Sequence, residues 1–449
     1  MATRRQMLKL SGMAVASAAL AALAQQPAPA DYTIEIAAYG LEVAPRKTIK
    51  TIAYNRQVPG PILRLKEGQP ITIDVTNQTG NSEVVHWHGL FLPPAVDGAM
   101  EEGTPLIPGG GRARYTFTPR PAGFRWYHTH TFAGKDLHKG QYTGQHGFLL
   151  IEPRDHPAGY DQEIFLALHD WDGDFLANSD GSMDPVYTVS TINGRILGFG
   201  EPLRVKPGEQ VRFEFLNSSP TEVHWIALSG HQFKVIALDG NQVPQPQTVP
   251  MLRLAPAERV SAMVEMNHPG VWVMGEVRKH IMAAGMGIVV EYAGSSGKPQ
   301  WDQPNQLLWD YLKFAASDAP SSQQADAITI PLVFESKFAG HGAMDHWTIN
   351  GKSYPDTNSP ILTAGQRYRL SFINRSTNNH PVHLHRHSFE LRSMPGTPET
   401  HGIVKDTVLV DAGTEVAVEF TANNPGSTLF HCHQQNHMDA GFMMLFQYA

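Results

Sequence analysis

The chain has 449 residues, which is enough for about three domains of ordinary size. Its formal net charge is -7 at pH 7, and charged residues make up 17% of it without a long run of one sign. This composition gives no reason to expect a nucleic acid or an anionic membrane as a partner. The 40 glycines and 33 prolines instead favour short strands joined by many turns.

Residues 1–30 predict an export signal that is removed from the mature protein. Arg4 and Arg5 lie in a charged start, and residues 13–24 form a run of small apolar side chains that is too short for a stable membrane anchor. The paired arginines indicate the twin-arginine export machinery. We therefore expect a periplasmic or secreted protein without stable membrane insertion, and an uncleaved anchor is the alternative.

Three segments of the chain repeat one strand pattern. In each, an alternating apolar strand leads through a glycine turn into a second strand that ends at an asparagine, and a histidine-bearing strand follows. The asparagines are Asn77, Asn217 and Asn374, and the histidine-bearing segments are 85–90, 223–228 and 380–385. The repeat predicts an all-β fold of three tandem Greek-key β-sandwich domains, each of seven or eight strands.

The domain bounds follow from the spacing of the repeats and from one stretch where the pattern lapses. Residues 317–327 are rich in serine, alanine, aspartate and glutamine, as linkers are. We therefore expect the first domain at 31–154, the second at 155–297, and a linker followed by the third domain at 298–449.

Four short stretches of the chain concentrate histidine. They are His86-Trp87-His88-Gly89, Trp126-Tyr127-His128-Thr129-His130, His380-Pro381-Val382-His383-Leu384-His385, and His431-Cys432-His433 followed by His437. In a strand, a His-x-His pair places both rings on one face. Four such clusters in one chain predict metal sites.

Cys432 is the only cysteine of the chain, so it forms no internal disulfide. Two histidines and one cysteine with a weak axial position describe an electron-transfer copper centre. Because successive side chains of a strand point to opposite faces, Cys432 can face one metal while His431 and His433 face another. The segment predicts two connected metal sites, and a cysteine that serves only as a small buried hydrophobe is the alternative.

The second repeat lacks this chemistry. His224 and His231 occupy the positions that His380 and His387 hold in the third repeat, but Met274-Gly275-Glu276 stands where the third repeat has its cysteine. We expect no copper in the second domain, and core or turn roles for its two histidines. His341 and His346 lie in a segment that reads as a polar loop, with an accessory metal site as the alternative.

The histidine motifs, their order and the three repeats resemble the multicopper oxidase family, in its three-domain laccase-like branch. The resemblance covers the whole mature chain and implies cupredoxin-like domains and four copper ions. It implies a type 1 copper held by His380, Cys432 and His437, a type 2 copper held by His86 and His383, and a type 3 pair held by His88, His128, His130, His385, His431 and His433.

The resemblance also places the carboxylate of Asp97 beside the copper cluster, as a proton donor or an orienting group. An Asp-Gly turn is the alternative for Asp97. Phe442 takes the axial position where many bacterial relatives have methionine, which predicts a raised type 1 potential; a shifted register that brings in Met443 is the alternative. Met438 stands where some relatives have glutamate, and Asp439 is the candidate for that proton role.

The resemblance implies a laccase-like enzyme that oxidises phenols or aromatic amines and reduces dioxygen to water, and we expect a monomer. Oxidation of Cu(I) or another low-valent metal ion is the second reading. A methionine-rich insertion is typical of such relatives, whereas Met344 and Met394 are isolated in the sequence. A structural protein without copper and a two-domain nitrite reductase are disfavoured, because the ligand set and the three repeats are complete.

Overall fold

The computed structural model describes residues 28–153, 159–178, 181–306, 308–317, 327–397 and 399–449. Residues Tyr32–Ala449 form one compact unit. Most of the predicted export signal lies outside the described residues, and its assignment stays a prediction. In the part of the chain that is described, no helix has both the length and the apolar character that a membrane crossing requires.

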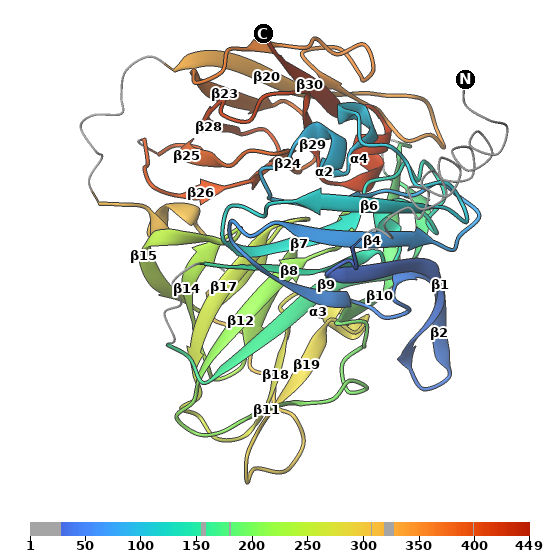
Figure 1. The fold of residues 1–449 in the computed structure, drawn as a ribbon. Coiled ribbons are helices and arrows are strands. Elements are labelled where there is room, and N and C mark those ends of the chain that lie inside the picture. Colours follow the sequence, from blue (N-terminus) through green and yellow to red (C-terminus); the bar gives the residue numbers. More distant parts are fainter. Residues whose placement is uncertain (1–27, 154–158, 179–180, 307, 318–326, 398) are drawn as a thin grey trace, which may run out of the picture. The chain divides into compact units, whose positions relative to one another are not determined.

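The first domain consists of two four-stranded sheets, in the orders β2-β1-β4-β6 and β3-β8-β7-β5 (Figure 1). Its strands are β1 (Tyr32–Ala44), β2 (Lys47–Tyr54), β3 (Gly60–Lys66), β4 (Ile71–Asn77), β5 (Val85–His86), β6 (Arg112–Phe117), β7 (Gly123–Thr129) and β8 (His146–Glu152). Three short helices interrupt them: α2 (Pro94–Asp97) and the 3-10 helices η1 (Met100–Glu102) and η2 (Gly140–Tyr142).

The second domain pairs a six-stranded sheet, β10-β9-β12-β17-β14-β15, with a five-stranded sheet, β11-β19-β18-β13-β16. Its elements are β9 (Gln162–Ala177), β10 (Met183–Ile192), β11 (Leu203–Val205), β12 (Gln210–Asn217), β13 (His224–Leu228), β14 (Phe233–Leu238), β15 (Asn241–Val249), β16 (Leu252–Leu254), β17 (Arg259–Glu265), β18 (Val271–Glu276), α3 (Lys279–Ala283) and β19 (Gly287–Tyr292).

The third domain repeats this plan with the sheets β21-β20-β23-β28-β25-β26 and β22-β30-β29-β24-β27. Its elements are η3 (Tyr311–Phe314), β20 (Ile328–Lys337), β21 (His346–Ile349), β22 (Ile361–Leu362), β23 (Arg367–Asn374), β24 (His380–Leu384), β25 (Phe389–Ser393), β26 (Val404–Lys405), β27 (Thr407–Val410), β28 (Glu415–Thr421), β29 (Thr428–Cys432), α4 (Gln435–Asp439) and β30 (Met443–Tyr448). The expectation of three tandem all-β domains is confirmed. The expected seven or eight strands hold for the first domain, whereas the described parts of the second and third each have a six-stranded and a five-stranded sheet.

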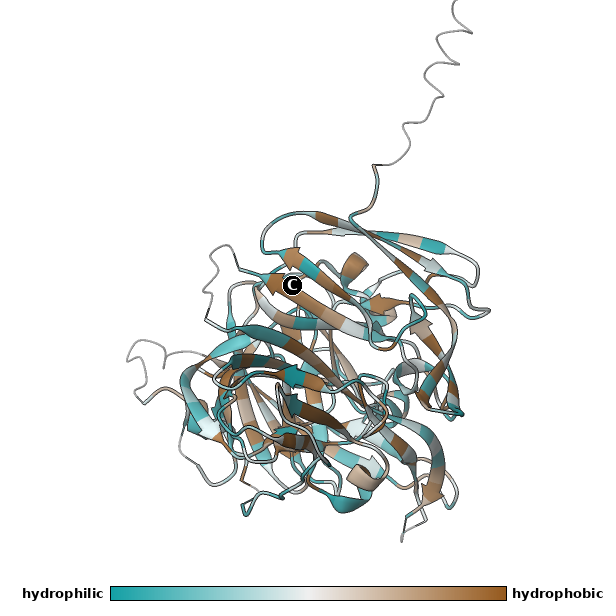
Figure 2. Ribbon diagram, turned by 90° about the horizontal axis from the view of Figure 1, so that it is seen from below, coloured by the Kyte–Doolittle hydropathy of each residue, from teal (hydrophilic) through white to brown (hydrophobic). Residues whose placement is uncertain are grey.

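Alternating burial explains why these segments form sandwiches. Along β23 every second side chain is buried, and Figure 2 shows hydrophobic and hydrophilic bands along the strands. Such a strand buries one face against the opposite sheet and leaves the other toward solvent. The buried faces of the second and third domains contribute to one continuous hydrophobic cluster.

The repeated asparagine makes the same hydrogen bonds in each domain. Asn77, Asn217 and Asn374 each accept a hydrogen bond at Oδ1 from the backbone N–H two residues ahead, at 2.9 Å. Each also donates from Nδ2 to carbonyls of a distant segment, such as Ile107 O and Leu254 O. The amide therefore closes one turn and fastens it to a second strand, which accounts for its recurrence.

The histidine-bearing segments differ in their local structure. Those of the second and third domains are strands, but in the first domain only Val85–His86 is a strand. Beyond it Leu90 N donates to Trp87 O, and Gly89 has φ +83°. The predicted strand over 85–90 is therefore wrong after His86, because the chain turns at Gly89.

Candidate metal centres

The outer site is formed by His380, Cys432 and His437. Cys432 ends β29, which pairs with β24 so that Val382 lies opposite it, and His437 comes from α4. Cys432 Sγ lies 3.7 Å from His380 Nδ1 and 3.6 Å from His437 Nδ1, and the two nitrogens are 3.1 Å apart. One soft sulfur and two imidazole nitrogens converge on one point, as a trigonal copper site requires.

Both imidazoles of the outer site are neutral. Burial lowers the pKa of His437 to about 3 and puts the pKa of His380 well below its ordinary value. Ser376 Oγ lies 2.8 Å from His380 Nε2 and fixes this ring with Nδ1 toward the sulfur. Burial raises the pKa of Cys432, so a bound cation is needed to stabilise the thiolate.

Phe442 directly precedes β30 and Met443 is the first residue of that strand, and the two side chains belong to different hydrophobic clusters. The Phe442 ring centroid is 4.8 Å from that of His380, and Phe442 belongs to the same buried cluster as Cys432. Met443 packs instead with Ala99, Leu429 and Met438. Phe442 therefore occupies the position next to the outer site, and Met443 does not.

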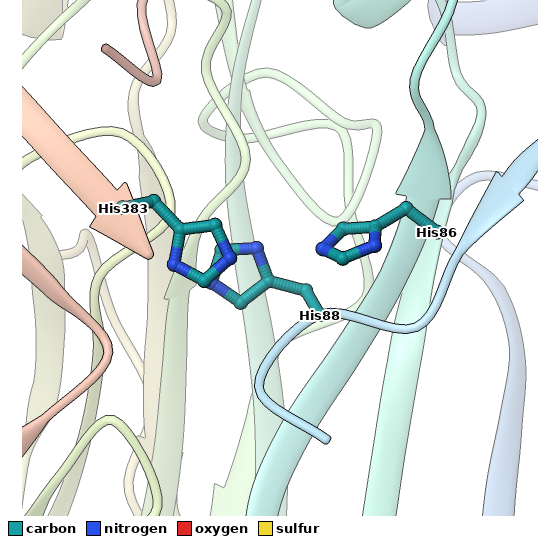
Figure 3. Close-up of side chains that lie close together, drawn as sticks. All are labelled: His86, His88 and His383. Carbon is teal, nitrogen blue, oxygen red and sulfur yellow. The ribbon is translucent and has the colours of Figure 1, made fainter. Parts of the chain in front are cut away.

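Eight histidines form the inner site, and all are buried. Four come from the first domain and four from the third, so the site joins segments from the two ends of the described chain. Three groups of ligand atoms lie within 4.8 Å of one another: His86, His88 and His383; His88, His128 and His433; and His130, His385 and His431. Figure 3 shows the first group with its rings turned toward one another.

Most of these rings are fixed through one nitrogen. Those of His86, His128, His383 and His431 each donate from Nδ1 to a backbone carbonyl at 2.7 to 2.8 Å. His86 Nε2, His128 Nε2 and His383 Nε2 have no hydrogen-bond partner among the described residues. A buried nitrogen without a hydrogen-bond partner lowers the stability of the fold, and a bound metal ion would supply the missing partner.

The contact between His385 and His431 requires a cation. Nδ1 of His385 donates to Asp97 Oδ2 and Nδ1 of His431 donates to Cys432 O. In a neutral imidazole the second nitrogen then carries only a lone pair. Yet the two Nε2 atoms lie 3.1 Å apart. Two lone pairs at this distance repel unless a cation lies between them. Burial lowers the pKa of both rings and so disfavours a proton, whereas metal–imidazole bonds of about 2 Å suit the separation.

Burial also keeps seven of the inner histidines neutral. It lowers the pKa of His383 to about 3 and depresses the pKa values of six others well below the ordinary value. Those six are His88, His128, His130, His385, His431 and His433. Neutral imidazoles are the form that binds metal ions, so the donor set fits three closely spaced copper ions.

One strand connects the two sites. His431 and Cys432 are adjacent at the end of β29, and His433 follows them. His431 and His433 belong to the inner groups, whereas Cys432 belongs to the outer group. The backbone between these residues is a short covalent path from one site to the other.

Two carboxylates lie beside the inner site. Asp97 Oδ2 is 2.9 Å from His385 Nδ1 and 3.1 Å from His86 Nδ1. Asp97 also ends α2 before Gly98, which has φ +102°, so the turn and the contact coexist. The sequence analysis missed Glu102, whose Oε1 is 3.6 Å from His385 Nδ1. Burial and the nearby charge of Asp97 raise the pKa of Glu102.

Asp439 makes different contacts from Asp97. Its oxygens accept hydrogen bonds from Ala133 N, Gly134 N and Gln435 Nε2, so it ties α4 to the first domain. Burial raises the pKa of Asp439 to about 7.

Asp406 is a further residue that the sequence analysis missed. Its Oδ1 accepts a hydrogen bond from His88 Nε2 at 3.1 Å, and its backbone carbonyl accepts from His383 Nδ1 at 2.7 Å. The sequence holds a signal for it, because Lys405-Asp406 is a charged pair inside an otherwise apolar strand segment.

The histidines of the second domain have other partners. His224 lies between Asp170 and Glu276, at 2.8 and 3.1 Å. Burial alone would lower the pKa of His224, but the two carboxylates raise it to about 9. His231 contacts Ser229 O and Tyr292. Within the described residues, the groups suited to a metal ion lie in the first and third domains.

Two adjoining hollows of about 370 and 330 Å³ lie beside the outer site. His437 lines one of them, and Asp184, Thr377, Asn378 and Asn436 line both. We call them together the His437 groove. Met183, Met344 and Asp345 also line it. His341 lies in the same loop as Met344, and His346 is the first residue of β21; both are exposed. The predicted polar loop therefore ends one residue earlier than expected, at Asp345.

Three parts of the chain match models of one protein family. Residues 38–156, 169–288 and 331–449 each match a model described as multicopper oxidase.

Relatives of known identity agree with these matches. "Multicopper oxidase MmcO" of Mycobacterium tuberculosis is 30% identical over 442 residues, which cover 89% of this chain and 83% of that protein. "Laccase-4" of Thanatephorus cucumeris is 26% identical over 463 residues, which cover 85% of this chain and 82% of that protein. The crystal structure of Fet3p, described as a multicopper oxidase that functions in iron import, has a TM-score of 0.78 at 19% identity over 93% of this chain and 90% of that one.

Proposed function

Because this chain belongs to the multicopper oxidase family of copper oxidoreductases that use dioxygen, we propose that it is a laccase-like oxidase of phenols or aromatic amines. Four one-electron oxidations of the substrate are coupled to the reduction of one dioxygen to two waters. The observation that carries this proposal is the single strand end, His431-Cys432-His433, that contributes to both the outer and the inner site.

We assign the copper ions as the resemblance to the family implies, and the groups of ligand atoms support this assignment, with His88 present in two of them. His380, Cys432 and His437 hold the type 1 copper, and His86 and His383 hold the type 2 copper. The type 3 pair is held by His88, His128 and His433 on one side and by His130, His385 and His431 on the other. When bound, these coppers supply one-electron transfer at the outer site and binding and reduction of dioxygen at the inner site.

Electrons are collected from the substrate at the outer site and delivered to dioxygen at the inner site. His437 lines the His437 groove, so it is the ligand nearest to a bound substrate. The thiolate of Cys432 and the backbone to His431 and His433 provide the covalent path inward. Phe442, whose ring lies beside that of His380, offers no donor atom to a copper ion bound at the outer site, which would favour the reduced state of that ion and raise its potential.

Asp97 serves the inner site as a proton donor or an orienting carboxylate. Reduction of dioxygen to water consumes four protons for four electrons, and these protons must enter a site lined by neutral imidazoles. Asp97 Oδ2 contacts both His86 and His385. Its carboxylate fixes the tautomer of His385, its backbone carbonyl fixes that of His86, and the side chain lies next to the inner site, where protons are consumed.

The remaining proposals rest on the sequence. Arg4 and Arg5 support export by the twin-arginine route to the periplasm or beyond, as a monomer. The mature chain would divide into domains at 31–154, 155–297 and 298–449, of which the second holds no copper.

Oxidation of Cu(I) or another low-valent metal ion is the second candidate function. Met344 is isolated in the sequence, but Met183 N donates to Ala343 O at 3.1 Å, so Met183-Asp184 and Met344-Asp345 come together in the His437 groove. Thioether sulfur is a ligand that selects Cu(I), and carboxylates attract a cation. This pairing of two domains supports a metal substrate.

Oxygen uptake by the copper-loaded protein tests the proposal and separates the two candidates. A phenol, an aromatic amine and Cu(I) are compared as reductants, and Cys432→Ser is the control for oxidation that does not use the outer site. Faster uptake with the organic donors supports the laccase-like function. Uptake only with Cu(I) supports the second candidate, and uptake equal to that of Cys432→Ser with every reductant contradicts both.

A further inference from the structure

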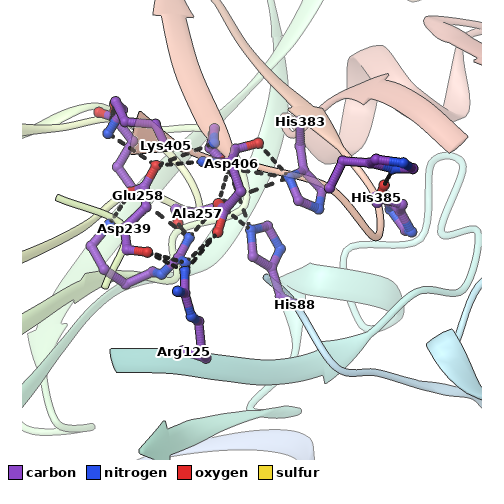
Figure 4. Close-up of polar contacts among 12 residues, drawn as sticks. His88, Arg125, Asp239, Ala257, Glu258, His383, His385, Lys405 and Asp406 are labelled. Carbon is purple, nitrogen blue, oxygen red and sulfur yellow. Dashed lines mark hydrogen bonds and ion pairs between the residues drawn. The ribbon is translucent and has the colours of Figure 1, made fainter. Parts of the chain in front are cut away.

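Six charged side chains are buried where the three domains meet. Arg125 comes from the first domain, Asp239, Glu258 and Arg259 come from the second, and Lys405 and Asp406 come from the third. Figure 4 labels all of them except Arg259. None of the six is more than 1% exposed. Three are cations and three are anions, so the cluster carries no net charge. We call these six residues the junction cluster.

Arg259 makes the most direct contact between domains in this cluster. Its Nη1 donates to Asp406 Oδ1 at 2.7 Å and its Nη2 donates to Asp406 Oδ2 at 2.6 Å. The guanidinium thus holds both oxygens of one carboxylate, the geometry that fixes a carboxylate most firmly. Arg125 Nη1 is farther away, at 3.5 Å from Asp406 Oδ2. Arg259 therefore sets the orientation of the Asp406 side chain.

The Asp406 carboxylate in turn orients a ligand of the inner site. Its Oδ1 accepts from His88 Nε2 at 3.1 Å. This contact places the proton of His88 on Nε2 and leaves Nδ1, which has no hydrogen-bond partner among the described residues, toward the inner site. Two contacts thus connect the second domain, whose described residues include no metal-ligand group, to His88 in the site formed by the first and third domains.

The second domain also holds the backbone of this segment. Asp239 Oδ2 accepts from Asp406 N and Thr407 N, both at 3.2 Å. Asp239 Oδ2 also lies 3.0 Å from Lys405 Nζ. Because Asp406 O accepts from His383 Nδ1, this backbone contact reaches a second ligand of the inner site.

Gly89 provides independent evidence of this close packing. A Cβ atom at Gly89 would lie 2.6 Å from Asp406 Oδ2 and 3.0 Å from Arg259 Nη2. The residue after His88 therefore has no space for a side chain, because the Arg259–Asp406 pair lies against its backbone. The position of this pair and the position of the His88 backbone depend on each other.

We propose that Arg259 is a positioning residue for the inner copper site: acting through Asp406, it holds the His88 ring with Nδ1 toward the metal. The second domain thereby contributes to copper binding without supplying a ligand. This inference rests on the copper assignment proposed above. Groups that orient a metal-bound histidine typically change metal affinity by about 10- to 100-fold when they are replaced.

Two variants at Arg259 test this role. Arg259→Lys keeps the positive charge and removes the paired hydrogen bonds, and Arg259→Leu removes both. If Arg259→Leu does not fold, Arg259→Lys carries the test alone.

Arg253 supplies the matched control. Arg253 Nη1 and Nη2 bind Asp411 at 3.1 and 2.5 Å, so this pair also joins the second and third domains through two hydrogen bonds. Arg253 is not among the residues that contact a ligand histidine in the inner site. Arg253→Lys therefore weakens the domain contact without disturbing His88.

Titration of each copper-loaded protein with a copper chelator gives the readout, with copper per chain and the absorption spectrum measured at each step. We expect Arg259→Lys to release its inner copper at about 10- to 100-fold lower chelator concentration than the wild type, with the near-ultraviolet band of the type 3 pair lost first and the blue band retained. Arg253→Lys should follow the wild type.

Equal chelator profiles for wild type, Arg259→Lys and Arg253→Lys would overturn the inference while leaving the copper assignment intact. An equal loss in both lysine variants would show a general effect of domain docking and would also overturn it. A wild-type protein that binds no inner copper would refute the proposed function, and the inference with it.

Discussion

Asp97 Oδ2 lies 2.9 Å from His385 Nδ1, although the two residues are 288 positions apart in the sequence. The same oxygen is 3.1 Å from His86 Nδ1. Asp97 thus fixes a histidine from each of the two domains that form the inner site: its carboxylate accepts from His385, and its backbone carbonyl accepts from His86. The carboxylate contact joins the domains and orients His385 at once, so its loss should affect dioxygen reduction more than electron uptake.

Asp97→Asn should slow the reoxidation of the reduced enzyme by dioxygen by about 10²- to 10⁴-fold, the usual contribution of a positioned acid or base. The blue band and its bleaching by substrate without oxygen should stay unchanged, because the outer site does not contact Asp97. Stopped-flow absorption measures both steps. Reoxidation at the wild-type rate would show that Asp97 only closes the turn at Gly98.

Phe442→Met should lower the potential of the outer copper, because a thioether at the axial position stabilises the oxidised ion. Redox titration of the blue band measures it. Phe442→Leu, which offers no donor atom, should keep the potential close to the wild-type value.

Met443→Leu tests the register of the same strand. Met443 packs with Ala99, Leu429 and Met438, away from the outer site, so this variant should leave the potential unchanged. A large shift in Met443→Leu would identify Met443 as the axial group instead.

The second domain should lose stability in alkali because of His224. The folded pKa of about 9 lies above the ordinary value of 6.5, so the stabilisation is complete below about pH 6.5 and is lost as the pH rises through about 9. Linkage converts this shift into about 3 kcal/mol. We expect the apparent Tm to fall across this window in the wild type and to fall less in His224→Gln.

His231→Gln is the control for that experiment. Burial lowers the pKa of His231, so this residue is already neutral in the alkaline window and its replacement should leave the alkaline fall of Tm in place. The same slope in wild type and His224→Gln would contradict the charged state assigned to His224.

The His437 groove distinguishes cationic from neutral substrates. Asp184 and Asp345 line this groove, and a double variant, Asp184→Asn with Asp345→Asn, removes both negative charges. The KM for Cu(I) should rise several-fold, because the groove then no longer attracts a cation. The KM for a neutral phenol should change little. Steady-state oxygen uptake measures both constants, and an equal change for the two reductants would assign these carboxylates a structural role.

Much of the fold could be predicted from local pattern, whereas the grouping of the ligands followed from the resemblance to a known family. Period-two burial and the recurring Asn77, Asn217 and Asn374 indicated three sandwiches, because each repeat carries its own strand and turn signals. The neighbours of Cys432 indicated two sites, because alternation along a strand is a local property. The same expectation failed for residues 85–90, because the chain turns at Gly89 and the strand ends at His86.

Other residues of the sites could not be found in this way. Asp406 lies 318 positions from His88, and the pairing of Arg259 with Asp406 depends on how three domains dock. The approach of Met183 to Met344 likewise exists only in the fold. Glu102 had a weak signal, the pair Glu101-Glu102 shortly after Asp97, but the sequence does not tell which acid points inward.

The central claim is that the sulfur of Cys432 connects an outer copper to an inner group of three. The most direct measurement compares copper content, absorption and oxygen uptake of the pure wild-type protein and of Cys432→Ser. We predict a blue, fully loaded wild type that consumes oxygen, and a colourless variant that keeps its inner copper and consumes none. A colourless wild type, or a variant that stays blue, would contradict the account.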